Sequence, residues 1–145
     1  MKVSRILATK PSKMITIGAS QEIRSAVNML AEHKIGALLV VDEAGKLIGI
    51  LSERDIVRRA AESEDVFSYS VGDVMTRNVR VGLPQDDMMS VAHTMTEGRF
   101  RHLPIVNDNY DLVGMISIGD VMKAQRDAYR GEIDTLEMQI MANDD

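Results

Sequence analysis

The strongest constraint on the fold of this chain is an internal repeat that spans most of its length. Residues 14–61 align with residues 78–126, at an offset of 64 for the first few positions and of 65 after one extra residue in the second copy. A lead-in segment recurs as well, because residues 3–7 resemble residues 71–75. Self-similarity of this kind indicates two copies of one supersecondary unit. The chain is therefore expected to fold as two related halves followed by a tail.

Each copy has the pattern of a short strand, a helix, two strands and a second helix. In the first copy, apolar residues at helical spacing predict a helix over residues 23–30, and continuous apolar runs predict strands over residues 37–41 and 47–51. The second copy repeats this order, beginning with a short strand at residues 79–81. A unit of about 60 residues buries only a marginal core alone, so the copies should pack together with pseudo-two-fold symmetry.

The expected fold class is therefore mixed α/β, of the α+β type. Two β-α-β-β-α repeats would pack through their sheets, and a C-terminal helix would follow them. We place the first repeat at residues 1–66, the second at residues 67–125, and an acidic helical tail at residues 126–145. The polar stretch at residues 62–70 is expected to link the two repeats.

Composition excludes several classes of function. The 145 residues are too few for a (β/α)₈ barrel of about 250, and the longest apolar run, of seven residues, is far shorter than the roughly 20 that span a bilayer. The net charge of −5 and the five aromatic residues argue against nucleic acid as a partner. The absence of cysteine excludes disulfides and cysteine-based zinc sites. The N-terminus lacks the pattern of a secretory signal, so we expect a cytoplasmic protein without a membrane segment.

Both copies carry the motif Gly-h-h-Ser-x-x-Asp, in which h is hydrophobic, where the last strand meets the last helix. The first copy runs from Gly49 to Asp55 and the second from Gly114 to Asp120. A serine three residues before an acid at a helix start is typical of a capping box, which satisfies free backbone N–H groups. A helix N-terminus also favours an anion, and the carboxylate could accept hydrogen bonds from both hydroxyls of a ribose. Taken alone, these residues leave both interpretations open.

The duplicated order of elements and the doubled motif resemble a tandem pair of cystathionine-β-synthase (CBS) domains, called a Bateman module, over roughly residues 1–125. The resemblance implies that an adenine nucleotide (AMP, ADP, ATP or NAD) or S-adenosylmethionine binds in the cleft between the repeats. It places Asp55 and Asp120 at ribose, and Ser52 and Ser117 near phosphate. It further implies a homodimer and a partner protein that responds to ligand occupancy.

The two copies differ at the start of the central strand, where Arg101 and His102 replace Gly36 and Ala37. Guanidinium and imidazole groups beside a helix N-terminus favour phosphate, and similar basic residues contact nucleotide phosphates in the regulatory γ subunit of AMP-activated protein kinase, another CBS protein. We therefore expect the better site in the second copy. Its expected members are Asp120 at ribose, Ser117 and Gly119 at the turn, Arg101 and His102 at phosphate, and Thr76 and Val79 in the segment beside adenine.

The first copy keeps Ser52 and Asp55 but lacks the basic pair, so its site is expected to be weaker. Arg54 is a candidate phosphate contact there, and a solvated arginine at a helix start is the alternative. Neither a nucleophile elbow nor an oxyanion hole accompanies Ser117, His102 and Asp120, so we expect no enzymatic activity and no catalytic residues. No metal site is expected. The main rival hypothesis is a structural or protein-interaction module without a ligand, in which both motifs only cap helices.

The tail is predicted to be helical over residues 123–141. Tyr129, Ile133, Leu136 and Ile140 are spaced by 4, 3 and 4 residues, which is the stripe of a two-heptad coiled coil. Gly131 lies inside this segment and costs about 1 kcal/mol relative to alanine. The stripe fits two arrangements, packing onto the body of the chain or contact with a second copy or a target.

Overall fold

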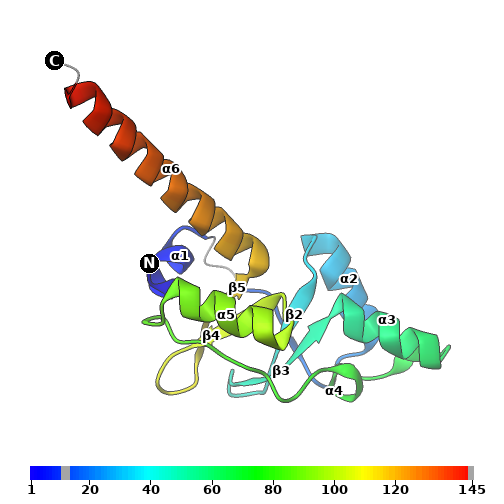
Figure 1. The fold of residues 1–145 in the computed structure, drawn as a ribbon. Helices are drawn as coiled ribbons and strands as arrows, with labels where there is room; N and C mark the ends of the chain where they lie inside the picture. The colour runs from blue at the N-terminus through cyan, green and yellow to red at the C-terminus, as the bar shows by residue number, and fades with distance from the viewer. Residues whose placement is uncertain (11–13, 144–145) are drawn as a thin grey trace.

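The computed structural model describes residues 1–10 and 14–143, and it has two small α/β halves and one long helix (Figure 1). The expected fold class is confirmed, because each half carries the predicted strands and helices apart from the first strand of the second copy. The first half contains β1 (Thr16–Gly18), α2 (Ile23–His33), β2 (Ala37–Val41), β3 (Leu47–Ser52) and α3 (Glu53–Glu62). The second contains α5 (Met88–Gly98), β4 (His102–Val106), β5 (Leu112–Ser117) and the start of α6 (Ile118–Asn143).

The first sheet has the order β1-β2-β3, with β1 parallel to β2 and β2 antiparallel to β3. The second sheet has only β4 and β5, because the strand expected at residues 79–81 is reduced to one bridge between Gly82 and Ile105. The carbonyl of Pro104 accepts a hydrogen bond from Gly82 at 2.9 Å, so the nitrogen of Pro104 faces the same side. Since proline has no N–H to donate, the parallel ladder cannot continue toward the N-terminal side of Gly82.

This bridge also corrects the alignment of the two copies. Ile17 pairs with Val40 in the first sheet, and Gly82 pairs with Ile105 in the second. Both members of the second pair lie 65 residues after their counterparts, so Gly82 rather than Val81 is the equivalent of Ile17. The extra residue of the second copy therefore lies before this strand position and not after it.

The two lead-in segments exchange places between the halves. Helix α1 (Val3–Ala8) packs its buried Val3 and Ile6 into the core of the second half. The 3₁₀ helix η1 (Val66–Ser68) and helix α4 (Val71–Val74) pack into the core of the first half. Backbone hydrogen bonds hold both segments, from Val3 N to Asp86 O at 2.9 Å and from Ile23 N to Tyr69 O at 2.8 Å. The expected linker at residues 62–70 is thus partly a core element.

A third apolar cluster joins the two halves. Leu39 and Leu47 from the first sheet pack with Val106 from the second, and all three are less than 7% exposed. Partly buried side chains surround them, including Ile50, Met115 and residues of the segment before α5. This cluster confirms that the repeats pack through their sheets.

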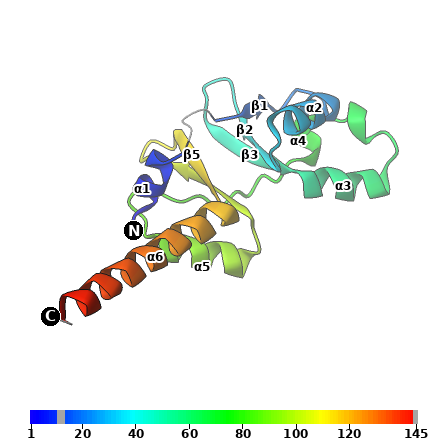
Figure 2. The same cartoon turned by 90° about the horizontal axis from the view of Figure 1, so that it is seen from above.

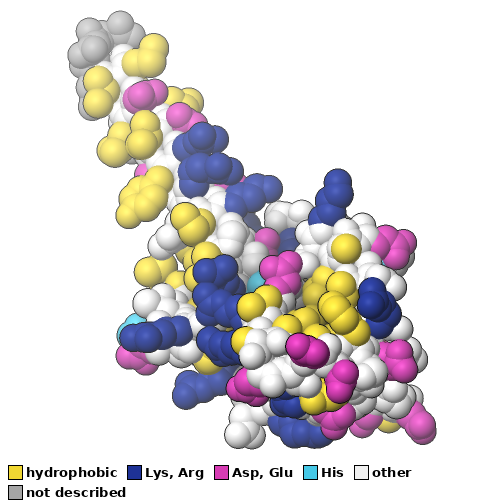
Figure 3. Space-filling view, turned by 90° about the vertical axis from the view of Figure 1, so that its right-hand side faces the viewer, with side chains coloured by type: hydrophobic (Ala, Val, Ile, Leu, Met, Phe, Trp, Pro, Cys, Tyr) yellow, Lys and Arg dark blue, Asp and Glu magenta, His cyan; other side chains and the backbone are white. Residues whose placement is uncertain are grey.

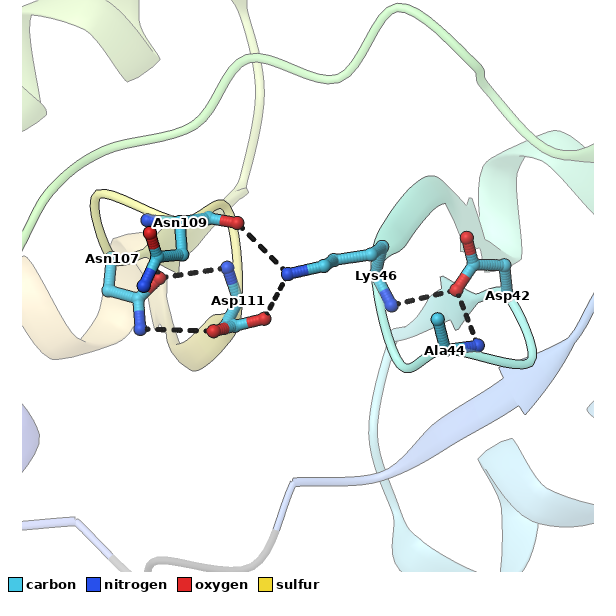
Figure 4. A network of polar contacts seen from close by, with 6 residues as sticks. All are labelled: Asp42, Ala44, Lys46, Asn107, Asn109 and Asp111. Atoms are coloured by element: carbon cyan, nitrogen blue, oxygen red, sulfur yellow. Dashed lines mark hydrogen bonds and ion pairs between the residues drawn. The ribbon is translucent and has the colours of Figure 1, made fainter.

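The pseudo-two-fold relation is visible at the turns that close the two hairpins (Figure 4). In each turn, the side chain of the first residue accepts hydrogen bonds from two backbone N–H groups, at 2.9–3.0 Å. Asp42 accepts from Ala44 and Lys46. Asn107 accepts from Asn109 and Asp111. Lys46 and Asp111 occupy equivalent places, 65 residues apart, and form an ion pair with each other. The Lys46 ammonium group also donates to the carbonyl of Asn109 at 3.0 Å, so this contact ties the two halves at one edge.

Helix α6 is the largest departure from two packed halves. The last helix of the second copy and the predicted tail helix form one continuous element of 26 residues. Val121 and Ala124 are buried against the second half, and the helix then extends away from both repeats (Figures 1 and 2). The stripe residues Tyr129, Ile133, Leu136 and Ile140 are all exposed, so packing of this stripe onto the body was the wrong alternative. Within the described ranges, no helix is both long and apolar enough to cross a membrane.

Candidate nucleotide site

Both Ser-x-x-Asp motifs form capping boxes. The hydroxyl of Ser52 accepts from the backbone N–H of Asp55 at 3.2 Å, and the Asp55 carboxylate accepts from Ser52 N at 3.0 Å. The corresponding distances for Ser117 and Asp120 are 3.1 and 2.8 Å. Only one carboxylate oxygen, Oδ2, is used in each box, so the capping role leaves the other oxygen of each aspartate for a further contact. The capping interpretation is confirmed, and it does not exclude a ligand.

A cavity of about 270 Å³ lies between the two halves at the start of α3. The first half contributes the motif residues Ser52, Arg54 and Asp55. The second half contributes Arg101 and His102, which immediately precede or begin β4. Because two further arginines, Arg58 and Arg99, also line this cavity, cationic side chains outnumber its acidic ones, which are Glu53 and Asp55.

Arg101 and His102 line this cavity together with Ser52 and Asp55, whereas Ser117, Gly119 and Asp120 are not part of its lining, although His102 pairs with Ser117 across the second sheet. The segment before β4 faces the corner between β3 and α3, and it also contacts its own helix start, because the carbonyl of Arg101 accepts a hydrogen bond from Ile118 N at 2.9 Å. Gly36 lies beside this pair, and a Cβ atom there would make an ordinary contact with His102 Cε1 at 3.7 Å. The basic pair of the second copy thus completes the cavity of the first.

His102 is a half-buried imidazole between the two helix starts. Burial, together with the positive charges of Lys10 and Arg101, lowers the pKa of His102 below its usual value. The negative charges of Asp120 and Glu53 act in the opposite direction but do not compensate. His102 is therefore neutral at pH 7 in this structure, and an anion placed beside it would favour its protonated form.

Thr76 also belongs to the first cavity rather than to the site around Asp120. Its hydroxyl donates to Asp55 Oδ1 at a long 3.4 Å, and its backbone forms two hydrogen bonds with Ile50, of 3.0 and 2.9 Å. Thr76 thereby extends the first sheet at the edge of β3. Val79 packs in the apolar cluster between the sheets, outside the lining of the cavity.

Gly49 allows this close approach of the lead-in segment, and the sequence analysis did not assign it a role. A Cβ atom at Gly49 would lie 2.6 Å from Met75 Sδ and 3.0 Å from the carbonyl oxygen of Thr76. Its counterpart Gly114 faces Leu7 in the same way, with a Cβ position 2.6 Å from Leu7 Cδ2. The glycine that opens each motif therefore gives space to the exchanged lead-in segment.

The second helix start differs because a lysine already contacts its aspartate. Lys10 Nζ donates to Asp120 Oδ2 and to the carbonyl of Met115, both at 2.7 Å. Burial raises the pKa of Asp120, but hydrogen bonds from Lys10 and Ser117 outweigh it and hold that pKa below the usual value. Lys10 was missed by the sequence analysis; the available signal was its place three residues after the first lead-in segment. Gly119 lies in the first turn of α6.

Two cavities adjoin Lys10. One, of about 320 Å³, is mainly apolar, and its lining includes Ile15, Ile35, Ala37 and Met115. The other, of about 410 Å³, runs beside α1 and α6 and includes Arg5 and Asp120. Lys10 lines both, so its ammonium group stands between an apolar space and the Asp120 carboxylate. Among the described residues, no cluster of three or more histidine, aspartate or glutamate side chains could hold a metal ion.

The sequence profile of the CBS domain matches this chain twice, at residues 3–62 and 71–127. The chain therefore belongs to the CBS-domain family and carries a pair of these domains. An uncharacterised 17.7 kDa protein of Acidianus ambivalens is 34% identical over 88% of this chain and 75% of its own length. The CBS domain-containing protein YhcV of Bacillus subtilis is 30% identical over 82% of this chain and 84% of its own length.

Solved structures of CBS-domain proteins have the same fold. The CBS-domain-containing protein ATU1752 from Agrobacterium tumefaciens is 38% identical, with a TM-score of 0.82 over 86% of this chain and 99% of its own. The CBS-domain pair of protein MJ0100, in complex with 5′-methylthioadenosine and S-adenosylmethionine, is 30% identical, with a TM-score of 0.78 over 88% and 98%. CBSX2 in complex with AMP is 25% identical, with a TM-score of 0.76 over 88% and 98%.

Proposed function

We propose that this chain is a regulatory module that binds a phosphate-bearing adenine nucleotide (AMP, ADP, ATP or NAD) in the cleft at the start of α3. The observation that carries the proposal is the composition of that cavity. A capping aspartate, Asp55, uses only one carboxylate oxygen in its box, so the other, which Thr76 contacts at a long 3.4 Å, can accept from ribose, and Arg101 and His102 line the same cavity from the other half. A helix N-terminus and guanidinium groups together favour phosphate. The structures of relatives with AMP or S-adenosylmethionine support an adenosine-type ligand.

The position of this cleft suggests how occupancy would reach a partner protein. Asp55 belongs to the first half and Arg101 to the second, so one nucleotide would contact both. A ligand that bridges two halves stabilises the relative arrangement in which both sets of contacts are made. We propose that a partner protein responds to that arrangement. In the rival hypothesis of a ligand-free interaction module, the same arrangement would be constant.

Thermal unfolding of the chain with a panel of ligands tests the proposal. AMP, ADP, ATP, NAD and S-adenosylmethionine would each be added at millimolar concentration, with adenosine and inorganic phosphate as matched controls. A nucleotide at 100 times its Kd adds about 2.7 kcal/mol, which raises the Tm of a domain of this size by several degrees. We expect a shift for at least one phosphate-bearing nucleotide that exceeds the shift with adenosine. If none of the ligands raises the Tm, the ligand-free module is the better account.

Binding should also be coupled to protonation of His102. The lowered pKa keeps the imidazole neutral at pH 7 in the free protein, and a nearby phosphate would raise it. Affinity should therefore increase as pH falls from 8 toward 6.5, by no more than about tenfold per pH unit for one proton. In the absence of ligand, the folded state favours the neutral form of His102. The contribution of His102 to folding stability is therefore present above about pH 6.5 and is lost as pH falls toward the lowered pKa.

Calorimetric titration in buffers of different ionisation enthalpy measures this proton uptake. The His102→Gln variant should lose the uptake that the wild type shows, and the exposed His33→Gln serves as the matched control. Comparing variants removes the contribution of the phosphate, whose own pKa lies near 6. Equal uptake by the wild type and His102→Gln would contradict a phosphate beside His102.

A further inference from the structure

The exposed part of α6 carries an apolar stripe that no described part of the chain covers. Tyr129, Ile133, Leu136 and Ile140 are 66%, 52%, 57% and 61% exposed. Figure 3 shows hydrophobic side chains along one side of the projecting helix and basic side chains on its other side near the body. Exposed Met122 lies seven residues before Tyr129 and extends the stripe toward the body. A contiguous apolar surface of this kind marks an interaction site.

We propose that this stripe pairs with the same stripe of a second copy, and that the two helices run antiparallel as a short coiled coil. The spacing places Tyr129 and Leu136 at d positions and Ile133 and Ile140 at a positions of two heptads. In an antiparallel pair, a positions face d positions. Ile133 would pack against the partner's Leu136, and Ile140 against the partner's Tyr129. This inference is independent of nucleotide binding.

The length of the free helix fits this register. Contact with the body ends at Gln125, which is half-buried beside Met89, so residues 126–143 project from the body and span about 27 Å at 1.5 Å per residue. In each facing pair the two residue numbers add up to 269. Position 143 of one helix therefore lies opposite Arg126 of the other. The two projecting segments therefore overlap along their whole length, and each helix ends where the body of its partner begins.

Charge favours the antiparallel over the parallel arrangement. Arg130 and Glu137 occupy e positions, and neither takes part in the ion pairs found among the described residues. In the antiparallel register, Arg130 would face the partner's Glu137, and the symmetry axis creates this opposite-charge pair twice. A parallel pair would instead place Glu132, at a g position, against the partner's Glu137. Flanking charges of this kind set helix orientation in coiled coils.

Disulfide trapping tests both the interface and its orientation, because the chain contains no cysteine. One sample of full-length protein would carry Tyr129→Cys and a second Ile140→Cys. In the proposed register, position 129 of one helix faces position 140 of the partner. Each position lies 11 residues, about 16 Å, from the same position in the partner. The mixed sample should therefore form a disulfide dimer several times faster than either variant alone. Met138→Cys, on the opposite side of the helix, is the control and should not cross-link.

Two results would overturn the proposal. Faster cross-linking of each variant with itself than in the mixture would show a parallel pair. Cross-linking no faster than that of Met138→Cys in every sample would show that the stripe does not bind a second copy and is free for another protein. Sedimentation equilibrium gives an independent check: Ile133→Asp should weaken self-association by at least tenfold. At a concentration low enough for both proteins to be monomers, the variant should keep the Tm of the wild type, since Ile133 is exposed on the projecting helix.

Discussion

Replacing Asp55 by asparagine should weaken nucleotide binding by about 10- to 100-fold. The substitution keeps the shape of the side chain and an oxygen that can accept from Ser52, but it removes the charge from the oxygen proposed to bind ribose. Hydrogen bonds to charged groups contribute about 1.5–3 kcal/mol, and 1.4 kcal/mol corresponds to a factor of ten. Calorimetric titration with the nucleotide that gives the largest thermal shift would measure the loss.

The chain contains a matched control for this variant. Ser70 and Asp73 form a third capping box at the start of α4, with distances of 3.2 and 3.3 Å, and neither residue lines the cavity. Asp73→Asn should therefore alter the free energy of unfolding as a cap variant does, by about 0.5–2 kcal/mol, and leave nucleotide affinity unchanged. Asp120→Asn reports separately on the second helix start. Unchanged affinity in Asp55→Asn would mean that this aspartate only caps its helix.

Gly49→Ala should lower the free energy of unfolding by about 1–3 kcal/mol, the usual cost of overpacking. The new methyl group would meet Met75 Sδ at 2.6 Å and the Thr76 carbonyl oxygen at 3.0 Å. Met75 is buried and Thr76 is bonded to Ile50 through its backbone, so the lead-in segment would have to move away from the sheet. Because Thr76 lines the cavity, nucleotide affinity should fall as well. Urea unfolding and binding measurements on the same sample test both effects.

Two other glycines provide graded controls. At Gly114 a methyl group would meet only the flexible end of the Leu7 side chain, so Gly114→Ala should cost less than Gly49→Ala. At Gly18 nothing lies within 4 Å of the Cβ position, so Gly18→Ala should change stability least. The same loss for all three would indicate that strand propensity, rather than the approach of the lead-in segment, sets the cost.

Much of the fold could be predicted because the relevant signals are local. Helix and strand periodicity, the serine and aspartate of each capping box, and the duplication itself all depend on residues that are close in sequence or compared by simple alignment. The heptad spacing from Tyr129 to Ile140 likewise indicated a helix with one apolar side. The missing strand of the second copy was not predicted, because its loss depends on which side of the sheet the nitrogen of Pro104 faces.

The composition of the cleft was decided by tertiary structure. Arg101 and His102 were assigned to Asp120 because they belong to the same copy, yet they line the cavity of Asp55. Lys10, which contacts Asp120, comes from a segment that packs on the opposite half from its own copy. Local rules determine what each segment forms, because they depend on bonds and contacts within a few residues. Which segments meet depends on how the apolar faces of the two halves bury each other, and this is determined only in the folded chain.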